Sequence, residues 1–237
     1  MTPRFDILTL HPDMVRPFFE SSILGRAQRQ GLLSVEVHNI RDHGLGPHRS
    51  VDDAPYGGGP GMVMRVDVVA NAIEQVRGDT GHVIYLDPAG EPFKQSVAQS
   101  LVSYEHLVLL CGHYEGIDAR ILRLVDQSIS MGDYVVTGGE IAACAVADAV
   151  ARLHEGVLGN PQSSLDESFA SGLLEYPQYT RPRLWREDEV PEVLLSGNHQ
   201  RVAGWRQSAA EARTKEVRPD LWRDWCNADV DAEPSTE

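Results

Sequence analysis

The chain has 237 residues, of which 42% are hydrophobic and 24% charged, and its formal net charge is −14. This length allows one large domain or two small ones, and the composition is that of a globular protein with a sizeable core, which excludes wholesale disorder. The acidic balance argues against a general nucleic-acid coat, because phosphate binding needs a cationic surface. Binding of RNA through a local basic patch remains open.

The cysteine content and the apolar runs indicate in which cellular compartment the protein is expected. The chain has an odd number of cysteines, Cys111, Cys144 and Cys226, and no two of them have the spacing of metal ligands. This favours a reducing compartment over a disulfide framework or a zinc site. The amino terminus has no signal-peptide hydrophobic region. The longest apolar run, 141–150, is interrupted by Asp148 and is too short to cross a bilayer. The sequence therefore predicts a cytoplasmic protein with no membrane partner.

Strand and helix patterns alternate through the first two thirds of the chain. Residues 4–10 and 33–40 have the pattern of strands, and a helix is expected to begin at Pro12 between them. Two apolar runs, 82–86 and 106–111, are typical of buried parallel strands. This alternation predicts an α/β domain with a mainly parallel sheet. The other segments with a helical pattern are 66–76, 93–101, 117–125 and 140–153.

The pattern changes after Gly159. Residues 160–171 are rich in Pro, Gln, Ser and acidic residues and lack periodicity, which is typical of a linker or a mobile loop. Beyond them we expect no strands, and short helices at 198–212 and 219–227. The expected division is a first domain over 1–159, a linker over 160–171 and a small helical domain over 172–237.

The second domain contains a basic stretch in this acidic chain. Residues 201–223 include six basic and three acidic residues, which gives this stretch a net charge of +3. The functional interpretation is contact with phosphates. The alternative is a solvated helix face with pairs of opposite charge four residues apart.

Glycine is concentrated in a first segment at 52–62, DDAPYGGGPGM. Four glycines and two prolines in seven residues allow neither helix nor strand, so an exposed loop is expected whose backbone a ligand can approach closely. It is not a Walker loop, because no Gly-Lys-Ser/Thr follows. The alternative is a flexible connector, against which the rigid Pro55 and Pro60 argue.

Three more junctions follow predicted strands or precede a helix: 85–90 (YLDPAG), 111–118 (CGHYEGID) and 129–140 (ISMGDYVVTGGE). Ligands of parallel α/β sheets bind at the carboxyl ends of the strands, and free N–H groups at a helix start can hold a carboxylate or a ring nitrogen. Taken singly, such a junction is also compatible with a tight turn. Together they predict a pocket for a small ligand, and the lack of Gly-x-Gly-x-x-Gly argues against an ordinary dinucleotide site.

Six motifs resemble, in the same order, those of the bacterial tRNA (guanine-N1)-methyltransferase family. They are YGGGPGM at 56–62, CGHYEGID at 111–118, GDYV at 132–135, GVLG at 156–159, YTRP at 179–182 and LLSGNH at 194–199. That family methylates N1 of the guanosine at tRNA position 37, next to the anticodon, and belongs to the SPOUT superfamily. The resemblance implies a parallel sheet whose C-terminal part forms a trefoil knot, contrary to the general rule against knots. It also implies a homodimer with shared active sites, in which the linker of one chain closes over the cofactor of the other.

By the same resemblance, the loops at 85–90, 111–116 and 131–140 hold the methyl donor S-adenosylmethionine in a bent shape. The residues expected to contact it are Tyr85, Leu86, Gly112, Met131, Gly132, Asp133, Tyr134, Val135, Val136, Gly138 and Gly139.

The chemistry requires two groups near the guanine. Neutral N1 carries a proton and is a poor nucleophile, so a base is needed near N1 and a cation or donor near O6, where negative charge accumulates. In the family an Asp of the linker is the proposed base and an Arg at the end of the preceding helix stabilises O6. The Arg matches Arg152, for which the alternative is an ordinary arginine that complements a helix dipole.

The linker of this chain has the sequence LDESF at 165–169. Aligned on the Ser-Phe pair at its end, Glu167 occupies the position of the catalytic Asp, and Asp166 is the flanking acid. A Glu performs the same proton transfer with a longer arm, so Glu167 is the expected base. A shift of register that makes Asp166 the base stays open.

The resemblance further implies contacts with the anticodon arm of tRNA and a dependence on Mg²⁺, for which Glu115 is the candidate ligand. The residues expected to contact RNA are Gly57, Gly58, Gly59, Arg181, Asn198, His199 and Arg206.

Two other functions are kept as alternatives. One is a non-catalytic RNA-binding member of the same knotted fold, silenced by the Glu in the linker; the presence of Arg152, Glu115 and all three cofactor loops argues against it. The other is a nucleotide-binding regulatory domain, which the missing phosphate-binding motif opposes.

Overall fold

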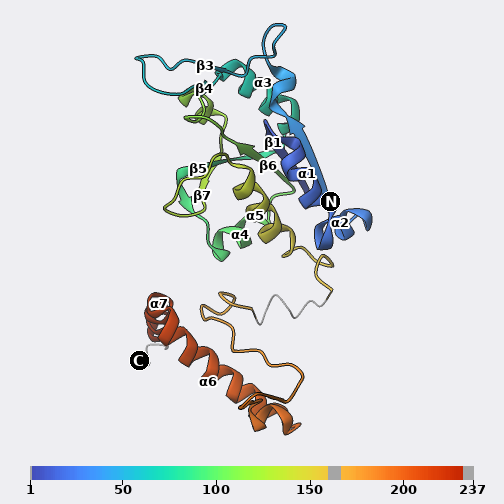
Figure 1. The fold of residues 1–237 in the computed structure, drawn as a ribbon, viewed down its shortest axis with the longest axis vertical. Helices are drawn as coiled ribbons and strands as arrows, with labels where there is room; N and C mark the ends of the chain where they lie inside the picture. The colour runs from blue at the N-terminus through green and yellow to red at the C-terminus, as the bar shows by residue number, and fades with distance from the viewer. Residues whose placement is uncertain (1, 160–166, 232–237) are drawn as a thin grey trace, which may run out of the picture. The chain divides into compact units, whose positions relative to one another are not determined.

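The structure, a computed structural model, describes residues 2–159 and 167–231. The chain divides into two compact units, Met1–Asn160 and Pro161–Glu237, which Figure 1 draws from blue to yellow and from orange to red. Among the helices of these described residues, none has both the length and the apolar character that a membrane span requires.

A five-stranded sheet in the order β2-β1-β6-β5-β7 forms the centre of the first unit. Its pairings are all parallel, which confirms the predicted α/β class. β6 is buried at every position, as expected of a continuous apolar run in the middle of a parallel sheet. The strands are β1 (Arg4–Thr9), β2 (Ser34–Asn39), β5 (His82–Pro92), β6 (His106–Cys111) and β7 (Gln127–Ser130).

Helices cover both faces of this sheet. Successive residues of β1 point to opposite faces, so that Phe5 and Ile7 join one core and Leu8 joins the other. The first core is completed by α1 (Pro12–Glu20), α2 (Ser22–Arg29), α4 (Gln95–Leu101) and α5 (Glu140–Ala151). The second is completed by α3 (Val66–Arg77) and the short 3₁₀ helices η1 (Ile40–His43) and η2 (Ala119–Arg123).

Several predicted elements differ from those observed. The helix expected at 117–125 is the short η2, and α2 and β7 were not predicted, because both are short and largely polar. Gly25 allows the close approach of α2 to α1, since a Cβ there would lie 2.1 Å from the carbonyl oxygen of Glu20. The strand predicted at 82–86 extends to Pro92, because the chain bulges at 87–90 and then pairs again with β7.

Short hairpins occur where no strand was expected. β3 (Asp52–Asp53) pairs with β4 (Val63–Met64) in antiparallel fashion and closes the glycine-rich segment, so its first two residues are strand and only 54–62 is loop. In the second unit, β8 (Leu184–Trp185) pairs with β9 (Asp188–Glu189), which corrects the expectation of no strands there. Strands of two residues are too short to give a periodic signal.

The second unit is otherwise helical. It contains η4 (Glu192–Leu195), α6 (His199–Val217) and α7 (Pro219–Asp231), the last two being longer than the helices predicted there. The side chain of Asn198 caps α6 by accepting a hydrogen bond from the backbone N–H of Arg201, and Pro219 begins α7, as expected of these residue types.

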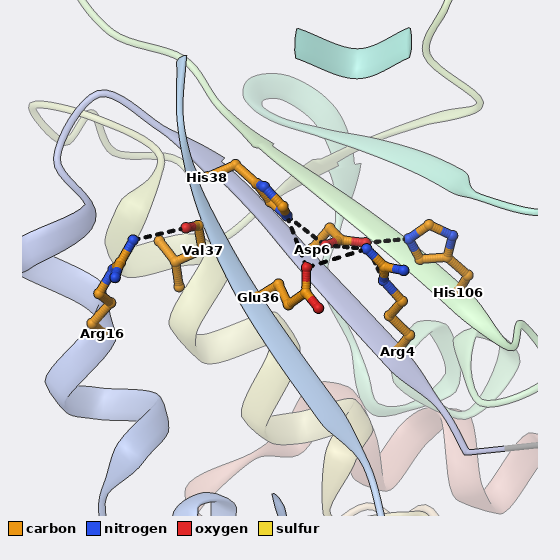
Figure 2. Close-up of polar contacts among 7 residues, drawn as sticks. All are labelled: Arg4, Asp6, Arg16, Glu36, Val37, His38 and His106. Atoms are coloured by element: carbon orange, nitrogen blue, oxygen red, sulfur yellow. Dashed lines mark hydrogen bonds and ion pairs between the residues drawn. The ribbon is translucent and has the colours of Figure 1, made fainter. Parts of the chain in front are cut away.

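A charged cluster ties β2, β1 and β6 together (Figure 2). The buried Asp6 accepts hydrogen bonds from Arg4, at 2.7 Å, from His38, at 2.6 Å, and from His106. Burial alone would raise the pKa of Asp6, but these three hydrogen bonds outweigh it and lower the pKa below its usual value. Asp6, Glu36 and His38 lie close enough to hold a metal ion. However, the Arg4 guanidinium, 3.4 Å from Glu36, already supplies the positive charge.

Candidate active site

A cavity of about 350 Å³ lies beside the bulge of β5 and the ends of β6 and β7. Its walls come from the chain around 85–88, 112–116, 129–132 and 134–142. These are the junctions that the sequence analysis expected to converge, so the predicted small-ligand pocket is present.

Most residues expected to contact the cofactor line this cavity. Asp133 is the exception: it is exposed and is not part of the lining. Lining residues that the sequence analysis did not single out include Asp87, His113 and Ile141. The expected residues that do line the cavity are Tyr85, Leu86, Gly112, Met131, Gly132, Tyr134, Val135, Val136, Gly138 and Gly139.

Two glycines allow the segment before α5 to contact the loop after β6. A Cβ on Gly139 would lie 2.8 Å from the Cα of Cys111, and the N–H of Gly139 donates to the carbonyl of Gly112 at 3.0 Å. A Cβ on Gly138 would lie 2.3 Å from Nε2 of His113, with which Gly138 forms a β-bridge. Any other side chain at these positions would push apart two walls of the cavity.

Glu140, in the first turn of α5, is a buried carboxylate behind these glycines. Its Oε1 accepts a hydrogen bond from the hydroxyl of Thr9 at 2.6 Å, and its Oε2 lies 3.1 Å from Nε2 of His113. An acidic side chain there also complements the helix dipole. Glu140 therefore holds three elements together: the end of β1, the loop after β6 and the start of α5. The sequence signal for it was an acid directly after a glycine pair at a helix start.

Tyr85 forms part of the same wall and is buried. Burial, reinforced by the charge of Asp87, raises the pKa of the Tyr85 hydroxyl to about 12. A Cβ on Gly112 would come within 3.0 Å of that hydroxyl. The ring thus packs against bare backbone and stays protonated at neutral pH.

The charge of the cavity is negative. Asp87 and Glu115 are among its lining residues, whereas neither arginine nor lysine is found in the lining that the described residues provide. Backbone amides, glycine surfaces and two carboxylates together suit a small ligand that carries positive charge. S-adenosylmethionine, with its sulfonium and ammonium groups, fits this description.

The expected catalytic residues belong to different units. Arg152 directly follows α5 as its C-cap residue, and its N–H donates to the carbonyl of Asp148 at 3.1 Å. Glu167 lines a second cavity, of about 370 Å³, within the second unit. Asp166 lies outside the described residues.

The residues expected to contact RNA also divide between the units. Gly57, Gly58 and Gly59 have φ values of 87°, 79° and 131°, and a Cβ at any of them would meet nothing within 4 Å, so their backbone is open to a partner. Their conformation is one that glycine adopts readily. In the second unit, the guanidinium of Arg206 lies 4.7 Å from the centre of the Tyr176 ring and lines the second cavity.

The remaining expected RNA contacts show structural features of their own. Arg181 is exposed and precedes a cis proline, and His199 is the first residue of α6. Asn198 has the capping role described above, which the sequence analysis did not foresee.

Comparison with known proteins identifies the family. Residues 3–224 match the family described as tRNA (Guanine-1)-methyltransferase TrmD. The tRNA (guanine-N(1)-)-methyltransferase of Thermus thermophilus is 53% identical over 218 residues, which cover 92% of this chain and 91% of that protein. The proteins of the same name from Moorella thermoacetica (52% over 223 residues; 92% and 89%) and Geobacter sp. strain M21 (50% over 231 residues; 95% and 93%) are similar to a comparable degree. The chain therefore belongs to the tRNA (guanine-1)-methyltransferase TrmD family.

Proposed function

We propose that this protein transfers a methyl group from S-adenosylmethionine to N1 of the guanosine at position 37 of tRNA. The observation that supports this best is the negatively charged, glycine-lined cavity beside the bulge of β5 and the ends of β6 and β7, in a member of this family. Three free cysteines agree with action in the cytoplasm.

The proposal includes the SPOUT architecture in its finer detail. The C-terminal part of the parallel sheet would form a trefoil knot, with 1–159 as the catalytic domain, 160–171 as the linker and 172–237 as the domain that binds tRNA. The close contact of Gly138 and Gly139 with the loop after β6 supports a crossing of these two segments.

S-adenosylmethionine supplies an electrophilic methyl group on a sulfonium sulfur. The residues of the cavity bind and orient it: glycine backbones leave room for it, Glu140 fixes the loops that contact it, and Tyr85 contributes a neutral ring wall. Asp87 and Glu115 favour its positive charge. These groups act on binding and orientation, which determine the geometry of attack.

Proton transfer is assigned to the linker. The carboxylate of Glu167, or of Asp166, accepts the N1 proton while N1 attacks the methyl carbon; the N1–C bond forms and the C–S bond breaks. The negative charge that appears on O6 is stabilised by Arg152. The products are methylated tRNA, a neutral thioether by-product and a protonated carboxyl group.

A homodimer with shared active sites explains how Arg152 and the linker acids can act on one guanine. The linker of one subunit would close over the cavity of its partner. Apolar side chains at the cavity support a covering surface, since Val135 is 85% exposed and Ile141 is 58% exposed.

Binding of tRNA is assigned to the open backbone of residues 57–59 and to the basic stretch of the second unit. Arg201 and Arg206 are exposed on α6, as phosphate contacts require. The +3 charge of this stretch provides the local cationic surface that the chain as a whole lacks.

The expected Mg²⁺ site, with Glu115 as its candidate ligand, stays part of the proposal. Mg²⁺ usually binds through one or two carboxylates completed by water and substrate phosphates. Glu115 lines the cavity, and Asp87 is a second carboxylate in the same lining. No step of the proposed reaction is assigned to the ion.

Methyl transfer to defined transcripts tests the proposal. The full-length protein would be incubated with methyl-labelled S-adenosylmethionine, Mg²⁺ and a tRNA transcript with guanosine at positions 36 and 37, beside a control transcript with adenosine at 37. We expect label in the first RNA alone. Label in neither, with the cofactor bound, would overturn methyl transfer and favour the RNA-binding alternative.

The same assay assigns the base. Glu167→Gln and Asp166→Asn remove one carboxylate each with little change of shape. The variant that lacks the base is expected to lose about 10²- to 10⁴-fold in rate, and the other is expected to stay near the unmodified enzyme. Full activity in both variants would exclude a linker carboxylate as the base.

A further inference from the structure

The Glu115 side chain occupies space that only a glycine at position 61 leaves free. A Cβ on Gly61 would lie 2.3 Å from Oε1 of Glu115, 2.5 Å from its Cγ and 2.8 Å from its Cδ. Gly61 has a φ of +77° and lies next to the last residue of the loop between β3 and β4 that also contains Gly57, Gly58 and Gly59. The aim of the Glu115 carboxylate therefore depends on the absence of a side chain at position 61.

Backbone hydrogen bonds fix the relative positions of these two segments. The N–H of Glu115 donates to the carbonyl of Met62 at 3.0 Å, the N–H of Met64 donates to Gly116 at 2.9 Å, and the N–H of Asp118 donates to Met64 at 3.0 Å. Met64 is fully buried. A larger residue at position 61 would therefore displace the flexible end of Glu115 more readily than the backbone of either segment.

The Glu115 carboxylate is not neutralised in this unit. Within the described residues it forms no hydrogen bond or ion pair, whereas the nearby Arg120 is paired with Asp118 at 2.7 Å. Glu115 also lines the cavity, where Asp87 adds a second negative charge. Its charge is therefore available to a ligand in the cavity.

A free carboxylate here distinguishes two molecules of nearly the same shape. S-adenosylmethionine carries a positive sulfonium, while the by-product S-adenosylhomocysteine has a neutral thioether at the same place and lacks only the methyl group. Hydrophobic contacts and backbone hydrogen bonds are similar for both. A negative charge, in contrast, stabilises the cationic form selectively.

We propose that Glu115 is a specificity-determining residue that favours the cationic methyl donor over its neutral by-product, and that Gly61 is the positioning residue that directs its carboxylate to the cavity. This inference rests on the proposed function. It assigns to the end of the glycine-rich loop a role in cofactor selection in addition to the RNA contact expected of residues 57–59.

The test compares affinities for the two ligands. Isothermal titration of the full-length protein, with EDTA and without tRNA, gives Kd for S-adenosylmethionine and for S-adenosylhomocysteine. The quantity of interest is the ratio of the two Kd values in each variant relative to that of the unmodified protein. A general distortion of the cavity would weaken both ligands alike and leave the ratio unchanged.

Four variants, with Glu115→Ala as the reference for the last, separate charge, position and strain. Glu115→Gln removes the charge and keeps the shape, and we expect the preference for the cation to fall by roughly five- to tenfold. Gly61→Ala displaces the charge and should lower the preference by about threefold, a smaller electrostatic effect. Gly46→Ala is the matched control, since Gly46 has a φ of +67° and a Cβ there would meet nothing within 4 Å; its ratio should not change.

The fourth variant combines Gly61→Ala with Glu115→Ala, which removes the three atoms that a Cβ at 61 would meet. Here the alanine at 61 should have no further effect on the ratio beyond that of Glu115→Ala alone. Equal weakening of both ligands by Gly61→Ala, or a changed ratio in Gly46→Ala, would overturn the inference and leave the proposed function standing. Failure of the unmodified protein to bind S-adenosylmethionine would instead overturn the proposed function, and this inference with it.

Discussion

The two sides of the central sheet differ in how their carboxylates are paired. Where β2, β1 and β6 adjoin, the buried carboxylate of Asp6 has partners in Arg4, His38 and His106 (Figure 2). At the cavity, the Glu115 carboxylate forms no hydrogen bond or ion pair among the described residues, and glycines expose backbone. A buried charge with several partners is part of the fold, whereas a charge left without partners beside a cavity is available for a ligand.

Glu140 lies between these extremes and clarifies the comparison. It is as buried as Asp6, but among the described residues two side chains hold it, Thr9 and His113, and His113 lines the cavity. Changes at Asp6 should thus affect stability alone, changes at Glu115 should affect binding alone, and changes at Glu140 should affect both.

The largest effect is expected from breaking the Asp6 cluster. Asp6→Ala leaves Arg4, His38 and His106 around an apolar side chain, and the free energy of unfolding should fall by about 3–5 kcal/mol. Urea denaturation measures this loss. Glu36→Gln is the control in the same cluster; its side chain is 58% exposed, so the expected loss stays below about 1 kcal/mol. Equal losses in both variants would contradict the central role of Asp6.

A substitution of Arg152 tests the proposed chemistry separately from the stability of the fold. Arg152→Ala should lower kcat by about 10²- to 10³-fold, as removal of a group that stabilises an oxyanion does, and leave Kd for S-adenosylmethionine unchanged. Single-turnover methyl transfer measures the rate. Arg29→Ala is the matched control, because Arg29 also lies at the last turn of a helix and complements its dipole. A similar loss in both variants would reduce Arg152 to a helix-capping residue.

A substitution of Glu140 tests whether one side chain contributes both to stability and to cofactor binding. Glu140→Ala removes the acceptor of the Thr9 hydroxyl, and a buried group without its hydrogen bond costs about 1–3 kcal/mol of stability. Loss of the contact with His113 should also loosen the loop after β6 and so weaken the binding of S-adenosylmethionine. Calorimetric titration and thermal unfolding follow the two effects, and Glu140→Gln should restore part of each. Lower stability with unchanged affinity would show that Glu140 belongs to the core alone.

Local patterns of the chain predict four of the five strands of the central sheet. The strands at 82–86 and 106–111 are continuous apolar runs, and the glycine-rich junctions after them follow from the rule that parallel strands present their ends together. The cavity was therefore predictable from residues close in sequence. β7 and α2 were not, because four and eight residues of mixed polarity give no clear periodicity.

Contacts between distant residues escaped sequence analysis altogether. Thr9 and Glu140 are separated by 131 positions, and Asp6 and His106 by 100. No spacing rule connects such residues, since their meeting depends on the order of strands in the sheet. The contact of Gly61 with Glu115 is of the same kind. The sequence predicts Gly61 only as part of a loop, whereas the structure shows that the Glu115 side chain leaves no room for a side chain at position 61.

The smallest effect is a dependence on pH that separates the two sides of the sheet. The pKa of Asp6 is lowered in the folded protein, because its three hydrogen bonds outweigh its burial. Its contribution to stability is therefore complete above the pKa of an unfolded Asp, about 3.9, and is lost as the pH falls through the lower folded value. The stability difference between the unmodified protein and Asp6→Asn should shrink as the pH falls below about 4. Tyr85, with a pKa of about 12, does not titrate in this range, so its hydroxyl adds no pH dependence to cofactor binding there.

Urea denaturation at several pH values measures the stability difference between the unmodified protein and Asp6→Asn. A stability difference that grows as the pH falls would show that Asp6 is protonated in the folded state.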